Sequence, residues 1–375
     1  MRVVISPDCF TGTLTATQAA SAIAAGWRSV APDDDLDLCP MSDGGPGFLH
    51  ALHCGLGGRI VPVLACGPTG DPVPAQVLRV GDTAYVESAQ ACGLDLVPAS
   101  LRAPDRLTSR GVADLVRAAV ADGATRVVIG LGGTGICDGG GGLLAGLGAT
   151  ATDDSGRDVT NLLTRGGGGL EPIAAVDLTA AREFLDGVDL VAATDVDVPL
   201  LGSRGAALGF APQKGADDAT VLRLEQALTS FAAAMGRRED GRSPAVALGA
   251  GAGGGLGFAV LALGGSRSAG VDSVVRAVGL KDRCRGAGLV ITGEGSFDWQ
   301  SLRGKVLTGV TGAALDAAAP VVVIAGKVEV GRRDWQAAGV SGAYSMVEIA
   351  GSAAVDRARE VLSATAAQVA RTWSR

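Results

Sequence analysis

The sequence predicts an α/β fold in which both ends of the chain form one doubly wound domain, with a second α/β domain of mixed sheet inserted between them. Short apolar runs alternate with helical periodicities at both ends, whereas short valine-rich strands with Pro and Gly turns fill residues 59–88. A chain of 375 residues also exceeds what one hydrophobic core usually supports. We therefore assign residues 1–57 and 258–375 to the first domain and residues 58–257 to the inserted domain.

The elements of the first domain follow from local patterns. Arg2–Ser6 and Asp35–Cys39 are short apolar or alternating runs and predict strands. Thr15 and Gln18 form a capping box that begins a helix reaching about Trp27. Three further strands are predicted near the carboxyl end, at Leu289–Thr292, Val321–Ala325 and Tyr344–Val347. The last helix is expected to carry one apolar face, made by Val355, Ala358, Leu362, Thr365 and Val369.

The inserted domain repeats a strand followed by a glycine- or aspartate-rich loop. Arg126–Gly130 predicts a buried strand that enters the glycine loop 132–142, and Val188–Ala193 predicts a second one before Thr194–Asp197. Helices are expected over 109–122 and along the apolar stripe from Val221 to Met235, which we interpret as core packing. Residues 246–265 carry no charge and are long enough to span a membrane, but eight are glycine, which favours a loop running into a buried helix.

Composition excludes several classes of protein. The net charge of −7 and the lack of a basic block disfavour nucleic-acid binding. Seven cysteines without CxxC spacing disfavour a disulfide framework or a zinc site and favour a reducing, cytoplasmic location. The first residues contain no long apolar run, so we expect no signal peptide. His50 and His53, without a third ligand nearby, are interpreted as ordinary helix residues, and no GxSxG motif is present.

The segment 291–305, ITGEGSFDWQSLRGK, is the most informative part of the chain. It follows an apolar run and places two carboxylates, Glu294 and Asp298, beside hydroxyls, an Arg and a Lys. Strands of an α/β sheet deliver such clusters to the crevice at their carboxyl ends, where ligands bind. Carboxylates near a Lys and near glycine-exposed backbone suit a phosphate and its metal ion. We therefore expect a phosphate-handling site here.

Three other glycine-flanked clusters could carry chemistry, and each has a plainer interpretation. Ser42–Gly45 could be an ordinary Asp-Gly turn. The glycine loop 132–142 could hold phosphate with its N–H groups, while Asp138 could simply cap a helix. Asp195 and Asp197 could hold Mg²⁺, act as a base, or cap a helix. No Walker A loop is present, and the GxGxxG match at 249–254 is weak.

Taken together, these segments resemble the bacterial glycerate kinases of the glycerate-2-kinase type. The shared blocks are an opening PDxFxGxL, an M-x-DGG loop, a GLGG…DGG loop, DVDxPLLGxRGAA…PQKGA, a glycine-rich GAGxxGGLG and TGEGxxDxQSLRGK. In this chain the blocks stand at residues 7–14, 41–45, 130–140, 195–216, 249–257 and 292–305. The resemblance spans essentially the whole sequence.

The resemblance implies a Rossmann-like first domain, an inserted α/β domain, and an active site in the cleft between them. It implies ATP- and Mg²⁺-dependent phosphorylation of D-glycerate to 2-phosphoglycerate by in-line transfer. The implied catalytic residues are Asp195, Lys214, Glu294 and Lys305. The implied substrate-binding residues are Asp8, Asp43, Gly44, Gly45, Asp298, Ser301 and Arg303. The implied cofactor-binding residues are Gly132, Gly133, Asp138, Gly139, Gly140, Gly253 and Gly254, with Asp195 and Asp197 at the metal.

The chain departs from the family pattern at Thr11, Pro46, Ile136, Cys137, Val198 and Ser296. These departures bear on the acceptor more than on the fold. Two alternatives to glycerate phosphorylation therefore stay open, a kinase for another small hydroxy acid and a catalytically silent regulatory paralogue. The expected partners are ATP and a small hydroxy acid, without nucleic acid or membrane. A homodimer is one option for the oligomeric state.

Overall fold

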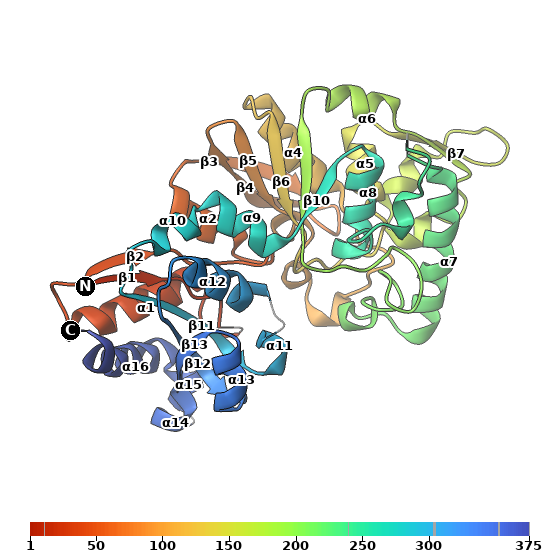
Figure 1. Cartoon of the computed structure of the whole chain (residues 1–375). Helices are drawn as coiled ribbons and strands as arrows, with labels where there is room; N and C mark the ends of the chain where they lie inside the picture. Colours follow the sequence, from red (N-terminus) through yellow and green to blue (C-terminus); the bar gives the residue numbers. More distant parts are fainter. Residues whose placement is uncertain (11, 239, 303–304, 352, 375) are drawn as a thin grey trace. The chain divides into compact units, whose positions relative to one another are not determined.

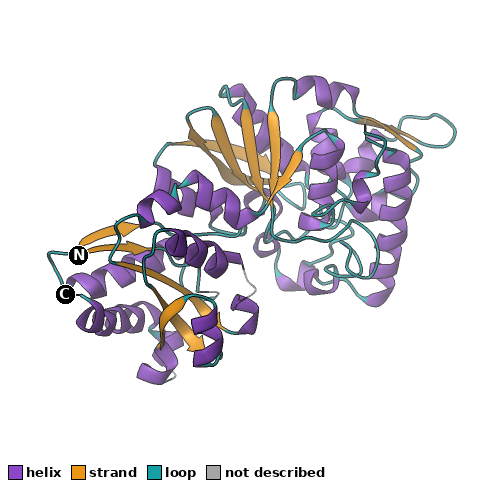
Figure 2. Cartoon of the chain, in the orientation of Figure 1, coloured by secondary structure: helices purple, strands orange, loops and turns teal. Residues whose placement is uncertain are grey.

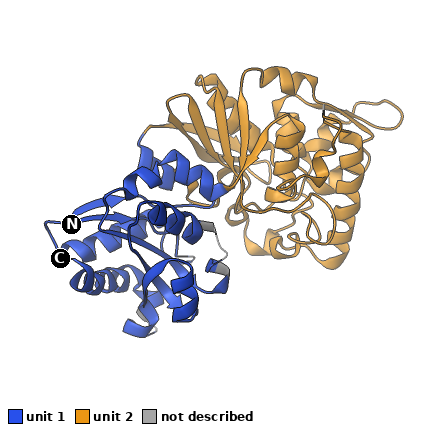
Figure 3. Ribbon diagram, in the orientation of Figure 1, with its two compact units in different colours: residues 1–43, 50–57, 270–375 blue, residues 44–49, 58–269 orange. Residues whose placement is uncertain are grey.

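The computed structural model describes residues 1–10, 12–238, 240–302, 305–351 and 353–374, and only the backbone of Gln300, Lys305 and Ala353. The chain divides into two compact units (Figure 3). Unit 1 contains Met1–Asp43, His50–Gly57 and Gly270–Arg375, and unit 2 contains Gly44–Leu49 and Gly58–Ala269. The second division therefore lies at 269/270 rather than at 257/258, and the segment 44–49 belongs to unit 2.

Unit 1 is built on a five-stranded parallel sheet in the order β13-β12-β11-β1-β2 (Figure 1). Its strands are β1 (Arg2–Ile5), β2 (Asp35–Leu38), β11 (Leu289–Phe297), β12 (Val321–Val328) and β13 (Val340–Ser345). Counted along the unit, the order is 2-1-3-4-5, the flavodoxin-like form of a doubly wound sheet. The predicted doubly wound domain is confirmed, and its topological switch point lies between β1 and β11.

Helices cover both faces of this sheet (Figure 2). They are α1 (Ala16–Arg28), α2 (Phe48–Leu56, whose first two residues belong to unit 2), α9 (Gly270–Ala277), α10 (Leu280–Cys284), α11 (Trp299–Leu302), α12 (Lys305–Asp316), α13 (Arg332–Ala337), α14 (Met346–Ala350), α15 (Ala353–Asp356) and α16 (Ala358–Trp373). On one face α1 and α16 pack together over β1, β11 and β12. Their approach is so close that a Cβ at Gly26 would lie 1.9 Å from the Ser363 carbonyl oxygen. The predicted capping box of Thr15 and Gln18 begins α1.

Three local predictions in unit 1 need correction. Strand β11 does not end at Thr292 but continues to Phe297, because β12 pairs with it through that residue. Strand β13 ends at Ser345, because the Ser345 hydroxyl accepts a hydrogen bond from the Glu348 N–H at 3.3 Å and begins α14. Val355 is 61 % exposed on α15 and does not belong to the buried face of α16.

Unit 2 contains a six-stranded mixed sheet in the order β10-β9-β6-β5-β4-β3, which confirms the predicted mixed sheet. Its strands are β3 (Arg59–Cys66), β4 (Pro72–Val80), β5 (Thr83–Glu87), β6 (Arg126–Gly130), β9 (Asp189–Ala193) and β10 (Ser266–Ser268), with β7 (Thr150–Thr152) and β8 (Ala175–Asp177) in a separate hairpin. The four strands from β10 to β5 are parallel, and β4 and β3 continue antiparallel. The loops after β5, β6, β9 and β10 therefore leave the same edge of the sheet.

The helices of unit 2 enclose one large apolar core with this sheet. They are α3 (Ala89–Cys92), α4 (Arg110–Ala121), α5 (Gly141–Leu147), α6 (Thr179–Phe184), α7 (Asp218–Met235) and α8 (Leu256–Ala262). The uncharged stretch 246–265 contains short turns and the buried α8, as expected, and α8 packs against β9 and β10 of this unit. Within the described part of the chain, no helix is both long and apolar enough to cross a membrane.

Candidate active site

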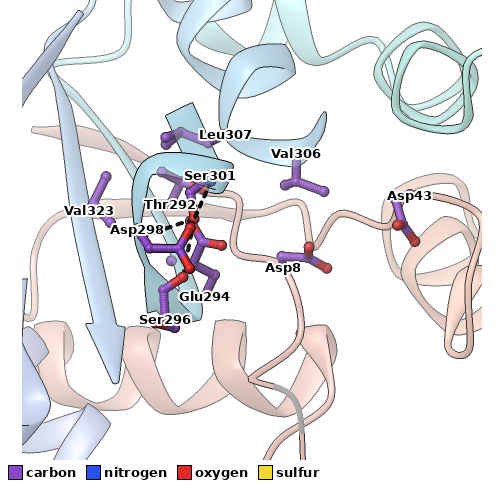
Figure 4. A pocket seen from close by; sticks show the side chains of 11 residues that line it. Asp8, Asp43, Thr292, Glu294, Ser296, Asp298, Ser301, Val306, Leu307 and Val323 are labelled. Carbon is purple, nitrogen blue, oxygen red and sulfur yellow. Dashed lines mark hydrogen bonds between the residues drawn. The ribbon is translucent and has the colours of Figure 1, made fainter. Parts of the chain in front are cut away.

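A cavity of about 310 Å³ opens at the carboxyl edge of the sheet in unit 1 (Figure 4). We call it the acidic cavity. Its polar lining consists of Asp8, Asp43, Thr292, Glu294, Ser296, Asp298 and Ser301. The cavity lies at the ends of β1 and β11, which is the switch point where open α/β sheets bind their ligands. The structure thus brings together five of the predicted site residues, from three separate parts of the sequence.

The strands themselves position the central residues of the acidic cavity. The backbone N–H of Asp8 donates to the Gly293 carbonyl at 2.8 Å, so the loop after β1 is tied to β11. Glu294 and Ser296 are alternate residues of β11 and therefore project from the same face of the sheet. Strand β11 thus holds Thr292, Glu294 and Ser296, whereas Asp298 and Ser301 lie at the start of the helix that follows it.

Glu294 has an unusual environment for a carboxylate. Burial raises the pKa of the Glu294 carboxyl from 4.5 to about 7, and the negative charges of Asp8 and Asp298 act in the same direction. A hydrogen bond with the Ser301 hydroxyl opposes this rise. A carboxyl group with a pKa near the working pH can accept or release a proton readily, as general acid–base catalysis requires.

Asp298 and Ser301 cap the start of α11 reciprocally. The Ser301 N–H donates to the Asp298 carboxylate at 3.2 Å, and the Asp298 N–H donates to the Ser301 hydroxyl at 3.2 Å. This arrangement fixes both side chains at the rim of the acidic cavity. Two predicted residues of the same segment cannot be placed: Arg303 lies outside the described residues, as does the side chain of Lys305.

Unit 2 contains a second candidate site, a cavity of about 340 Å³ at the glycine-rich loops that follow β6 and precede α8. We call it the lysine pocket. Its lining includes Gly132, Gly133, Gly251, Gly253 and Gly254 beside Thr134 and Lys214. The Lys214 side chain is 95 % buried, and its Nζ donates to the Ile136 carbonyl at 2.7 Å and to the Thr134 hydroxyl at 3.3 Å. Burial lowers the pKa of Lys214, and the nearby thiols and Asp138 oppose that shift.

The glycine loop does not offer all the N–H groups expected of it. The N–H groups of Gly132, Gly139 and Gly140 donate to the Gly44 carbonyl, the Gly254 carbonyl and the Asp138 carboxylate, each at 3.0 Å. These three N–H groups are therefore already hydrogen-bonded within the protein and hold neighbouring loops together. Gly44 itself has φ = +94°, and a Cβ there would lie 2.8 Å from the Ala193 carbonyl oxygen.

The Asp138 carboxylate is hydrogen-bonded within the protein. It is fully buried, and its carboxylate accepts hydrogen bonds from the N–H and hydroxyl of Ser109 at 2.8 Å and from the N–H groups of Gly140 and Gly142. The bond from Gly142 caps the first turn of α5, and the bonds from Ser109 tie the residue before α4 to the same carboxylate. The capping interpretation of Asp138 is therefore the one that the structure supports, although burial still raises its pKa.

The two aspartates after β9 differ in their surroundings. Asp195 is partly buried, whereas Asp197 is exposed and forms an ion pair with Arg267 of β10. Arg267 also donates to the Thr194 carbonyl at 3.1 Å, so it fixes the start of this loop. Asp197 is therefore already engaged by a guanidinium of its own unit, and both aspartates remain candidates for the metal. No cluster of three metal-ligating side chains occurs among the described residues.

Sequence reasoning missed two polar residues near the glycine loops. Thr134 is a hydrogen-bond partner of Lys214. It lies in the glycine loop 132–142, where the glycines and Asp138 were considered as candidates but Thr134 was not. Glu87 is buried at the end of β5, and its carboxylate accepts from the N–H groups of Gly47 and Leu49, each at 3.1 Å, at the start of α2. The sequence did contain a signal for Glu87, because an acidic residue at the end of an apolar strand is a candidate for a buried, hydrogen-bonded carboxylate.

Replacing Gly254 by Ala is expected to destabilise unit 2 by about 3 kcal/mol, because φ is positive and the added Cβ would lie 2.1 Å from the Ile136 carbonyl oxygen. Urea denaturation measures the change. Gly312→Ala in α12 is the matched control, since a Cβ there meets no atom within 4 Å and alanine favours the helix. A Gly254→Ala protein as stable as the wild type would contradict the geometry of this loop.

Comparison of the sequence and of the structure with known proteins points in each case to glycerate kinases. The model of the glycerate kinase family matches residues 3–374. A glycerate kinase of Bacillus subtilis is 38 % identical over 99 % of this chain and 97 % of its own length, and a glycerate 2-kinase of Escherichia coli is 36 % identical over 88 % and 86 %. A protein of Salmonella typhimurium LT2 assigned as glycerate kinase 2 has a crystal structure that matches with a TM-score of 0.84 and 36 % identity, covering 99 % of this chain and 98 % of that one.

Three findings define the class of protein. They are the doubly wound unit with polar groups at its switch point, the mixed-sheet unit with a buried lysine, and the relatives named above. It is an α/β enzyme of the kinase class, a phosphotransferase. More particularly, the chain belongs to the glycerate kinase family.

Proposed function

We propose that the protein transfers the γ-phosphoryl group of ATP to the C2 hydroxyl of D-glycerate and releases 2-phosphoglycerate and ADP. The observation that carries this proposal is the acidic cavity, where Glu294, with a pKa of about 7, lies among hydroxyl and carboxylate groups at the switch point of the sheet. In the reaction the acceptor oxygen bonds to the γ-phosphorus, and the bond to the β–γ bridging oxygen breaks. The hydroxyl proton passes to Glu294.

On the donor side we assign the ATP phosphates to the lysine pocket. Lys214 would supply positive charge in a water-poor environment, where it acts strongly on the charge that develops during transfer. Gly133, Gly253 and Gly254 line this pocket without side chains, so a phosphate could approach their backbone closely. Gly44 then acts indirectly, because its carbonyl accepts the Gly132 N–H and holds the loop after β6 in place. The role of Gly45 stays a prediction.

Mg²⁺ suits the oxygen donors that the chain offers. Asp195 is partly buried at the end of a parallel strand, and Mg²⁺ in kinases commonly takes one or two carboxylates together with phosphate oxygens and water. When bound, the ion would neutralise charge on the phosphates. The roles of Arg303 and of Lys305 stay predictions, as do the enclosure of the reaction between the two domains and a homodimer. A cytoplasmic location belongs to the same proposal, because the proposed donor, ATP, is available there.

A coupled assay of ADP release with ATP, Mg²⁺ and D-glycerate tests the proposed function, and NMR of the product identifies the phosphorylated carbon. We expect ADP release to depend on glycerate and the product to be 2-phosphoglycerate. Asp195→Asn should abolish this turnover, whereas Asp186→Asn, an exposed control in the same unit, should not change it. ADP release that is no faster with glycerate than without it would refute the proposal. A product phosphorylated at C3 would refute the position of transfer alone.

A further inference from the structure

A second, larger cavity of about 520 Å³ adjoins the acidic cavity in unit 1. Asp8, Glu294 and Ser296 line both cavities, so the two share a boundary. The second cavity has an apolar wall that includes Phe10 and Met346. Its volume far exceeds what a three-carbon acid needs, and none of the assignments above uses it.

The register of the sheet places one cation at this boundary. In the parallel pairing of β11 with β12, Ser296 lies opposite Lys327. Paired residues of neighbouring strands project from the same face, and so do alternate residues of one strand. Glu294, Ser296 and Lys327 therefore extend from one face at the carboxyl edge of the sheet, and all three line the second cavity.

The charges of the two cavities are uneven. Asp8, Asp43, Glu294 and Asp298 line the acidic cavity, and such a set repels the carboxylate of a hydroxy acid. Among the described residues that line either cavity, Lys327 is the cationic side chain, and it is exposed. Glu329 is the nearby acid of the second cavity, and it accepts a long hydrogen bond, at 3.5 Å, from the Ser296 hydroxyl.

We propose that the two cavities form one acceptor site, in which Lys327 binds the carboxylate of the hydroxy acid while the reacting hydroxyl lies at Glu294. Ser296, a small residue at the boundary, leaves the passage between the two groups open. Lys327 is then a substrate-binding residue that the motifs of the sequence did not indicate. This inference rests on the proposed function only in taking a hydroxy acid as the acceptor.

Steady-state kinetics of Lys327→Gln test the inference. We expect the KM for D-glycerate to rise about ten- to hundredfold, as the loss of one hydrogen bond to a charged group predicts, with kcat and the KM for ATP nearly unchanged. Lys327→Arg should recover part of the loss. Glyceramide, the neutral amide of the acceptor, should be used equally well by the wild type and by Lys327→Gln. The control is Lys281→Gln, an exposed lysine of the same unit that is paired with Asp316, which should leave all constants unchanged.

An unchanged KM for glycerate in Lys327→Gln would overturn the inference. So would an equal loss with glyceramide, which would show that the charge of the acceptor is not involved, or a rise confined to the KM for ATP. If the wild type shows no glycerate-dependent turnover, the proposed function fails, and calorimetric titration with D-glycerate decides the inference separately. Weaker binding by Lys327→Gln would then support it, and equal binding or no binding by the wild type would overturn it.

Discussion

Glu294→Gln is expected to lower kcat for glycerate phosphorylation by about 10²–10⁴, because glutamine cannot accept the proton of the acceptor hydroxyl. In the wild type, kcat/KM for the acceptor should rise with pH through about 7, where the buried carboxyl loses its proton. The variant should lack this rise. Glu360→Gln, at an exposed glutamate paired with Arg357, is the control and should keep the profile of the wild type. A Glu294→Gln enzyme that retains more than a tenth of kcat would exclude Glu294 as the base.

The Glu294 carboxyl group should also make the free energy of unfolding depend on pH. Its pKa is about 7 in the folded protein and 4.5 in the unfolded chain, so the folded protein binds more protons between these values. The contribution of Glu294 to the free energy of unfolding is therefore fully present below pH 4.5 and is lost as the pH rises through 7. Urea denaturation measures the free energy of unfolding at pH 5 and at pH 8. We expect this free energy to fall less between the two pH values in Glu294→Gln than in the wild type.

Lys214→Met is expected to lower kcat by about 10²–10³ and to leave the fold intact. The activity falls because the phosphates lose a buried cation. Stability changes little, because the lost hydrogen bonds to Ile136 and Thr134 are offset by no longer burying a charge. In this variant the rate of ADP release should therefore fall, while the midpoint of thermal unfolding should stay close to that of the wild type.

Two results would contradict this assignment. Full activity of Lys214→Met would remove Lys214 from the site. Equal losses of activity and of folded protein would show that Lys214 acts through the packing of its pocket. Arg182→Met, at an exposed cation of the same unit, controls for the loss of charge alone.

Local patterns were sufficient for most of the strands and helices of the fold. Arg126–Gly130 and the capping box of Thr15 depend on residues close in sequence, and both predictions are confirmed. The predicted end of β11 was wrong because Gly293 and Gly295 resemble a turn. Their strand conformation depends on pairing with β12, about thirty residues away.

The candidate site was predictable in its residue types but less so in its contacts. Asp8 was implied by the family resemblance, whereas Glu294, Asp298 and Asp43 were identified from polar clusters that follow strands. The partners of the glycine loop were not, because the Gly132 N–H meets Gly44 and the Gly139 N–H meets Gly254, and each of these contacts joins distant segments. The ion pair between Asp197 and Arg267 could not be predicted for the same reason, because the two residues are far apart in the sequence. Sequence spacing shows which groups are available, but it does not show which are already hydrogen-bonded.

The short segment Gly44–Leu49 means that unit 2 is not a self-contained module. This hexapeptide comes from the amino-terminal part of the chain, yet the Gly44 carbonyl receives the Gly132 N–H and the Phe48 ring packs edge-on against Tyr85 at 6.2 Å. A gene fragment that encodes only residues 58–269 would therefore lack a piece of its own interior. Recombination that exchanged this insert between relatives would have to preserve, in the remaining host sequence, a hexapeptide that fits the new insert.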